Sequence, residues 1–195
     1  MNPREASNWE TNDVPGCPIK GGPLLGTDSA DKLDGGEGDD EIRGLGAKDH
    51  LIGGLGSDVI YGGPGNDSLE GSSFLEGAAA DGSRLAQRLG RDRATSKDVL
   101  YGGPGRDMVD GEAGDDVLYG GDGDDGPLVG GKGEDVIYGG NGNDSIDGTE
   151  VTEFRGVVGK QRDKLYCGEG RDKYIPDELD YVDSTCEVKL PPSNI

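Results

Sequence analysis

A nine-residue unit recurs along this chain, and it constrains the fold more than any other feature of the sequence. The unit reads Gly-Gly-x-Gly-x-Asp-x-(apolar)-x, and five copies run without a break over 26–70. Further copies occupy 93–147, and a last pair occupies 162–175. A unit this short cannot bury its apolar side alone, so neighbouring units must stack. The repeat therefore predicts a solenoid.

The positions of the unit suggest how each coil is built. Glycine at positions 1, 2 and 4 permits the positive φ angles and the close backbone approach that a tight six-residue turn requires. The apolar residue at position 8 points inward from a three-residue strand and fills a thin core. Because each coil takes two units, the strands should form two parallel sheets. We therefore expect an all-β fold, a parallel β-roll.

The aspartates at position 6 are the candidate metal ligands. Each places a carboxylate beside the carbonyl groups of a turn, and an all-oxygen site of this kind suits a hard cation such as Ca²⁺. The candidates are Asp31, Asp40, Asp49, Asp58, Asp67, Asp98, Asp107, Asp116, Asp125, Asp135, Asp144, Asp163 and Asp172.

The composition indicates that folding needs help from cations. The formal net charge is −21, only 31% of the residues are hydrophobic, and 39 residues are glycine. Low hydrophobicity with high net charge usually leaves a chain disordered. We therefore expect the metal-free chain to be largely unfolded. A chain this acidic should also repel nucleic acid and anionic membranes, and no stretch approaches the length of a membrane span.

Over most of 26–175 these units resemble the RTX, or hemolysin-type, calcium-binding repeat. The resemblance implies that calcium lies between turns n and n+2 on each side of the roll, held by position-6 carboxylates and turn carbonyls. About eight Ca²⁺ ions would change the net charge from −21 to about −5. The turns before Asp31, Asp49, Asp98 and Asp163 lack expected glycines, so sites there are expected to be incomplete or empty.

The roll is predicted over 26–175, between an N-terminal arm or cap (1–25) and a C-terminal cap (176–195). Two inserts, 71–92 and 148–162, are interpreted as enlarged turns, and 84–90 is a candidate short helix. The C-terminal segment resembles the closing segment of short secreted calcium-binding repeat proteins, which implies a Cys167–Cys186 disulfide. Cys17 is then free or joined to another chain.

Positions 7 and 9 face outward, and they differ between the two sheets. Alternate units carry valine at position 7 and tyrosine at position 9, and the intervening units carry mainly polar pairs. This Val-Tyr stripe comprises Val59, Tyr61, Val99, Tyr101, Val117, Tyr119, Val136, Tyr138 and Tyr166. Two interpretations remain open. The tyrosines simply stack along the sheet, or the stripe is covered by inserts, termini or a neighbouring subunit.

Nothing in the sequence favours catalysis. His50 is the single histidine and is expected on the surface, so no hydrolytic triad can be assembled. The sequence at 121–126 matches GxGxxG, but its acidic side chains would repel a phosphate. We therefore expect no enzyme activity.

The interpretation favoured is a secreted or cell-surface calcium-binding protein that assembles with itself, as a filament or surface layer, through the Val-Tyr stripe or the roll ends. One alternative is a monomeric calcium-dependent adhesion module. Another is the detached RTX tail of an exported enzyme or toxin.

Overall fold

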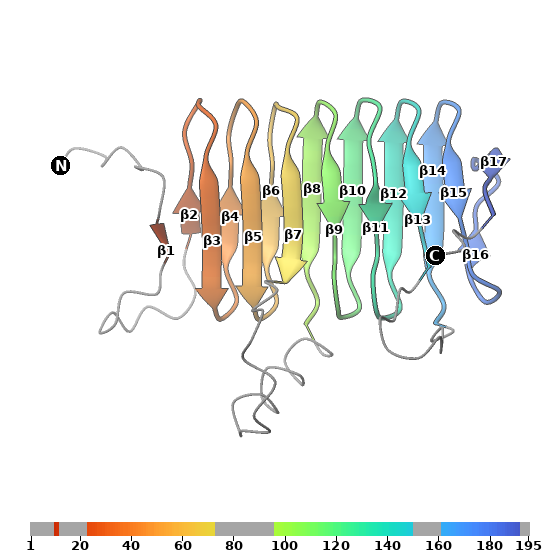
Figure 1. Ribbon diagram of the computed structural model, residues 1–195, viewed down its shortest axis with the longest axis horizontal. Coiled ribbons are helices and arrows are strands. Elements are labelled where there is room, and N and C mark those ends of the chain that lie inside the picture. Colours follow the sequence, from red (N-terminus) through yellow and green to blue (C-terminus); the bar gives the residue numbers. More distant parts are fainter. Residues whose placement is uncertain (1–9, 12–22, 73–95, 150–160, 192–195) are drawn as a thin grey trace, which may run out of the picture.

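The computed structural model describes residues 10–11, 23–72, 96–149 and 161–191 (Figure 1). In these segments every regular element is a β-strand, and all strand pairs are parallel. No helix within them is long and apolar enough to cross a membrane. The predicted helix at 84–90 and Cys17 lie outside the described residues, as do most of the two inserts and of the N-terminal arm.

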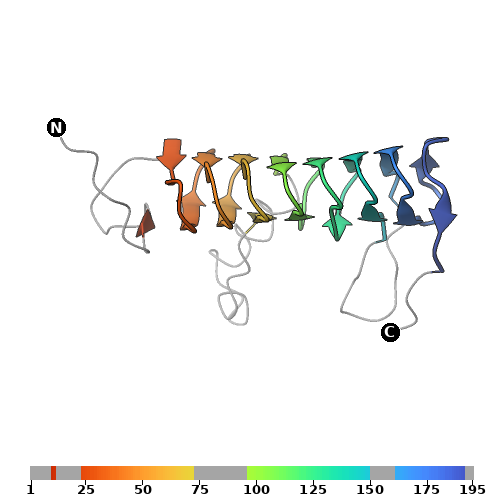
Figure 2. The same ribbon diagram turned by 90° about the horizontal axis from the view of Figure 1, so that it is seen from above.

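The strands alternate along the chain between two sheets, which Figure 2 shows as two layers. The nine-stranded sheet contains, in order, β1 (Glu10–Thr11), β3 (Lys32–Glu37), β5 (His50–Leu55), β7 (Ser68–Ser72), β9 (Met108–Asp110), β11 (Leu128–Val129), β13 (Ser145–Asp147), β15 (Lys173–Ile175) and β17 (Val188–Lys189). The eight-stranded sheet contains β2 (Pro23–Leu25), β4 (Glu41–Arg43), β6 (Val59–Tyr61), β8 (Val99–Pro104), β10 (Val117–Asp122), β12 (Val136–Asn141), β14 (Lys164–Glu169) and β16 (Tyr181–Val182). This is the predicted parallel β-roll.

The register of the coils continues across both inserts. Val59 pairs with Val99 although 40 residues separate them, and Val136 pairs with Lys164. The strands on either side of each insert are therefore neighbours in the same sheet. The segment predicted as a C-terminal cap, 176–195, contributes β16 and β17, which add one strand to the end of each sheet.

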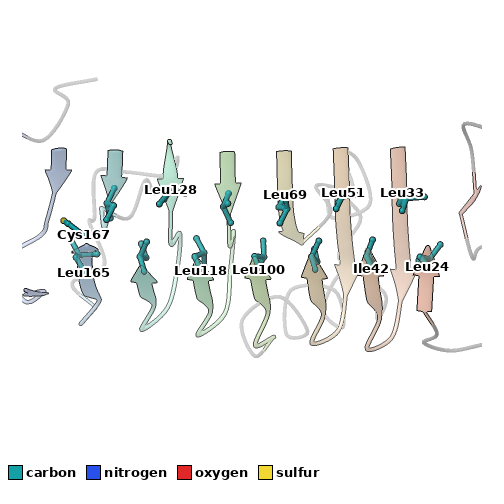
Figure 3. Close-up of a cluster of buried hydrophobic side chains, with 14 residues drawn as sticks. Leu24, Leu33, Ile42, Leu51, Leu69, Leu100, Leu118, Leu128, Leu165 and Cys167 are labelled. Carbon is teal, nitrogen blue, oxygen red and sulfur yellow. The ribbon is translucent and has the colours of Figure 1, made fainter. Parts of the chain in front are cut away.

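The core is a double row of single apolar side chains between the sheets (Figure 3). Every strand in the middle of the roll contributes its position-8 residue, and each of these is at most 3% exposed. The row contains Leu33, Ile42, Leu51, Ile60, Leu69, Leu100, Val109, Leu118, Ile137, Ile146 and Leu165, and the structure adds Leu24, Leu128 and Cys167. A core only one side chain thick buries little apolar surface per residue, so other interactions must hold the coils together.

The Val-Tyr stripe forms a continuous ladder on the outer face of the eight-stranded sheet. Successive rings from Tyr61 to Tyr166 stack with centroids 4.7–5.0 Å apart and planes within 12° of parallel. Arg43 extends the ladder at one end, with its guanidinium 5.0 Å from the Tyr61 ring centroid. The tyrosines therefore stack along the sheet, as the first interpretation predicts.

Candidate metal centres

The turns form two rows, one along each edge of the sheets. Row I leads from the eight-stranded to the nine-stranded sheet, along the upper edge in Figure 1, and row II leads back along the lower edge. Row I contains Asp31, Asp49, Asp67, Asp107, Asp125, Asp144 and Asp172. Row II contains Asp40, Asp58, Asp98, Asp116, Asp135 and Asp163. All these carboxyls are buried, none more than 9% exposed.

After the first aspartate of each row, one oxygen of every carboxylate holds neighbouring coils together. The Oδ1 atom accepts a hydrogen bond from the backbone N–H of the aspartate one coil earlier in the same row. Each of these N···O distances is 2.7–2.9 Å. The series of bonds begins at Asp31 and ends at Asp172 in row I, and it begins at Asp40 and ends at Asp163 in row II. Each aspartate is therefore both a turn residue and a bridge between coils.

The second carboxylate oxygen has no such partner in most turns. The Oδ2 atom accepts no hydrogen bond from any described residue in Asp49, Asp58, Asp67, Asp98, Asp107, Asp116, Asp125, Asp144 and Asp172. A buried oxygen without a hydrogen bond or a counter-charge is costly. The repetition of this arrangement along both rows is typical of a set of sites that a bound cation completes.

Backbone oxygens converge on the same places. A Cβ atom added to Gly102 would lie 2.6 Å from Asp107 Oδ2 and 2.6 Å from the carbonyl oxygen of Gly120 in the next coil. At Gly111 the corresponding distances are 2.8 Å to Asp116 Oδ2 and 2.7 Å to Gly130 O. The two oxygens thus leave room for the glycine hydrogen but not for a side chain, and a carbonyl oxygen of the next coil lies near each of these Oδ2 atoms. Carboxylate and carbonyl oxygens of this kind are the ligands that Ca²⁺ prefers.

The ionisation of these carboxyls supports the same conclusion. Burial raises the pKa of Asp58, Asp116 and Asp163 to about 8, and charge repulsion from neighbouring aspartates adds to the effect. Burial likewise raises the pKa of Asp107 and Asp144 to about 7. Burial also raises the pKa of Asp172, and the nearby Glu187 carboxylate adds to it. Without a bound cation, the five carboxyls whose pKa is about 7 or 8 hold a proton over much of the neutral range.

The donor set selects among metals. In the part of the chain that the structure describes, no three carboxylate, imidazole or thiol side chains gather around one point. Backbone carbonyls and water must therefore complete any coordination shell. Ca²⁺ accepts six to eight oxygen ligands of this kind in flexible geometry, whereas zinc prefers nitrogen and sulfur.

The turn before Asp49 lacks two of the expected glycines, yet its backbone follows the same path as the others. Leu45 and Ala47 occupy positions 2 and 4 and take φ angles of 82° and 78°. Glycine takes these angles elsewhere, for example 114° at Gly54 and 136° at Gly56. The site geometry is thus retained at the expense of backbone strain.

The first turn of row I is closed differently. Asp31 Oδ2 accepts hydrogen bonds from the backbone N–H of Thr27 at 2.6 Å and from its hydroxyl at 3.0 Å. Thr27 stands where position 2 normally has glycine. It therefore supplies donors to Asp31 Oδ2, whereas the Oδ2 atoms of the other row I aspartates accept none from the described residues.

Two acidic residues beyond the repeats continue the rows. Asp180 Oδ1 accepts from Asp163 N at 3.1 Å in row II, and Glu187 Oε2 accepts from Asp172 N at 2.8 Å in row I. Sequence reasoning missed both because the glycines of the unit are absent there. An available signal was the acid placed directly before a short strand, in Asp180-Tyr181-Val182 and Glu187-Val188.

The structure contains a disulfide between Cys167 and Cys186, the pairing that the resemblance implied. Cys167 occupies position 1 of its unit and is fully buried at the end of the core, beside Leu165 in Figure 3.

Comparison with known families identifies the repeat. The model of the RTX calcium-binding nonapeptide repeat matches in four copies, at residues 25–60, 44–74, 95–126 and 128–150, which together cover more than half of the chain. The chain belongs to the RTX calcium-binding repeat family. RTX repeats bind Ca²⁺ in their turns, and in this chain the position-6 aspartates of rows I and II would hold it together with turn carbonyls. No curated protein matches the chain.

Proposed function

We propose that this RTX protein is an extracellular scaffold, without catalytic activity, that calcium folds and stiffens and that then assembles with itself. The observation that carries the proposal is the combination of a core one side chain thick with two rows of buried carboxylates, in most of which the Oδ2 atom accepts no hydrogen bond from a described residue. Such a roll gains its stability when calcium binds, so it suits a compartment where calcium is abundant. The disulfide is consistent with an oxidising, extracellular setting.

The Val-Tyr stripe is the favoured surface for assembly. It is flat, it runs along the eight-stranded sheet, and its side chains are half-buried rather than covered by other described residues. The C-terminal end of the roll departs from the repeat, because it is formed by the two-residue strands β16 and β17 and carries the Cys167–Cys186 disulfide. It therefore offers a less regular edge on which to stack another coil.

The test is the molar mass in solution as a function of protein concentration in millimolar calcium, measured by light scattering after size exclusion. We expect mass to rise with concentration in calcium and electron micrographs to show regular assemblies. Replacing Tyr101, Tyr119 and Tyr138 with threonine should abolish the rise. The matched control is Met108→Thr, which changes an exposed apolar residue on the other sheet and should leave assembly intact.

A monomeric adhesion module is the second candidate. Ring stacking covers the faces of the tyrosines, so the stripe exposes mainly ring edges and offers less apolar area than its length suggests. A single monomer peak at every concentration in calcium would favour this candidate and contradict self-assembly.

A further inference from the structure

We propose that Glu187 is a calcium ligand. Together with Asp172 it completes a last site at the end of row I, outside the repeats, and the Cys167–Cys186 disulfide holds Glu187 in position. The inference rests on the calcium binding described above and adds a residue and a covalent bond that the repeat pattern does not include.

Glu187 occupies the place of a position-6 aspartate. Its Oε2 accepts the backbone N–H of Asp172 at 2.8 Å, just as Asp172 Oδ1 accepts the N–H of Asp144 at 2.8 Å. The residue that follows repeats the inner pattern as well. Val188 donates its N–H to Asp172 O at 3.0 Å, and Lys173 donates to Asp144 O at 2.8 Å. The backbone and one carboxylate oxygen of Glu187 thus continue row I by one turn.

Asp172 has the same unmet requirement as the aspartates of the inner turns. Its side chain is fully buried, and its Oδ2 accepts no hydrogen bond from any described residue. A buried carboxylate oxygen beside a second carboxylate is unfavourable unless a cation joins them. Glu187 is exposed, so a cation there would be reached from solvent and would keep water among its ligands.

The carboxylates at the start of row I and at the end of row II do not share this requirement. Asp31 receives two hydrogen bonds from Thr27 at the start of row I. Asp180, at the end of row II, accepts from Asp163 N through one oxygen and from Asp177 N at 2.6 Å through the other. Protein donors therefore serve both oxygens of Asp180 and the Oδ2 of Asp31. The Asp172–Glu187 pair differs, because Asp172 Oδ2 has no such donor.

The disulfide explains how a two-residue strand can hold a ligand in place. The last coil of row I is shorter than an inner coil, because 15 positions separate Asp172 from Glu187 whereas 18 positions separate Asp49 from Asp67. Cys186 directly precedes Glu187 and packs against the core, where it is bonded to the buried Cys167. Strand β17 contains only Val188 and Lys189, so the disulfide is the strongest constraint on where Glu187 lies.

The experiment counts calcium ions on the intact, oxidised chain by native mass spectrometry, with affinities from a chelator-competition titration. We expect Glu187→Gln to bind one Ca²⁺ fewer than the wild type. The Cys167→Ser/Cys186→Ser variant should lose the same ion. Glu187→Asp, which keeps the charge, should retain the count with at least about tenfold weaker binding at one site. The matched control is Glu169→Gln, an equal charge change on an exposed residue of the same coil, and it should keep every ion.

Each result has a definite meaning. A full calcium count in Glu187→Gln would overturn the assignment of Glu187 as a ligand. Loss of the ion in Glu187→Gln but not in the cysteine variant would overturn the positioning role of the disulfide. A wild-type chain that binds no calcium would instead overturn the proposed function itself. Circular dichroism in excess calcium checks that each variant folds. If Glu187→Gln does not fold, the affinity of Glu187→Asp at the one weakened site decides the test.

Discussion

Three residues adopt a backbone conformation that their side chains oppose. Leu45, Ala47 and Glu112 stand at turn positions where the repeat has glycine, and their φ angles are 82°, 78° and 69°. Such left-handed angles cost a non-glycine residue on the order of 1–2 kcal/mol. The stacking of neighbouring coils evidently enforces the turn at these positions, because the aspartate ladder passes through Asp49 without interruption.

Glycine should therefore stabilise the turn before Asp49. We expect Ala47→Gly to raise the free energy of unfolding in calcium by roughly 0.5–1 kcal/mol, since relief of strain exceeds the added entropy of the unfolded chain. Lys48→Gly in the same turn has no left-handed angle to relieve and should destabilise the protein. Denaturant unfolding in excess calcium measures both, and an unchanged or lower stability of Ala47→Gly would contradict the strain argument.

The residue roles illustrate what sequence alone can and cannot supply. The position-6 aspartates and the position-8 core residues follow from periodicity, because a strict repeat places equivalent residues in equivalent environments. The contacts of Thr27 with Asp31, and of Glu187 with Asp172, break the repeat and depend on three-dimensional closure at the roll ends. Sequence reasoning marked the turn before Asp31 as irregular but had no means to identify its hydrogen-bond donors.

At the scale of single strands, each element is too short to be stable alone and depends on its neighbours in the sheet and on the core between the two sheets. The continuity of the strands across the inserts could be predicted from the sequence, because Val-x-Tyr stands on both sides of the first insert and the tyrosine column continues at Tyr166 after the second. Strands β1, β2, β16 and β17 were not predicted. Their units lack the glycines that made the other turns recognisable, and only an apolar residue after an acid remains in β16 and β17.

This dependence on neighbours predicts a graded cost for core truncation. Leu118 is fully buried between coils on both sides, whereas Leu24 lies on β2 at the end of its sheet and is 7% exposed. We expect Leu118→Ala to cost about 2–5 kcal/mol and Leu24→Ala to cost clearly less. The midpoint of calcium-induced folding, followed by circular dichroism, reports both. Equal shifts for the two variants would show that the roll does not behave as a stack of locally coupled coils.

At the scale of the whole molecule, charge decides when the roll can form. The chain carries a net charge of −21, and its two rows of buried carboxylates concentrate that charge along the edges of the sheets. Calcium neutralises the rows from outside the chain, but protons can do so as well, because burial raises the pKa of these carboxyls from 3.8 to about 7 or 8 at Asp58, Asp107, Asp116 and Asp144.

Acid should therefore partly replace calcium. Between about pH 4 and pH 8 the metal-free folded roll binds more protons than the unfolded chain, so its stability falls as pH rises through this window and is greatest near pH 4. We expect calcium-stripped protein to show the β-roll circular dichroism spectrum near pH 4 and to lose it towards pH 8. In the presence of calcium the pH dependence of stability reverses, because protons compete with calcium for the carboxylates. The calcium concentration needed for folding should therefore increase as pH falls from 8 to 5.

A neutral side chain at a row II position separates the titration of the buried carboxylates from general charge repulsion. Asp116→Asn keeps the Oδ1 acceptor that holds Asp98 N at 2.9 Å but removes a buried charge. The metal-free variant should therefore stay folded to a higher pH than the wild type, while it needs more calcium to fold at pH 8. The control is Glu169→Gln, which removes one negative charge from an exposed side chain that is not one of the position-6 aspartates, and it should shift neither curve appreciably. If the two variants behave alike, net charge rather than the buried rows governs folding, and the carboxylates lose their role as the switch between the unfolded and the calcium-bound chain.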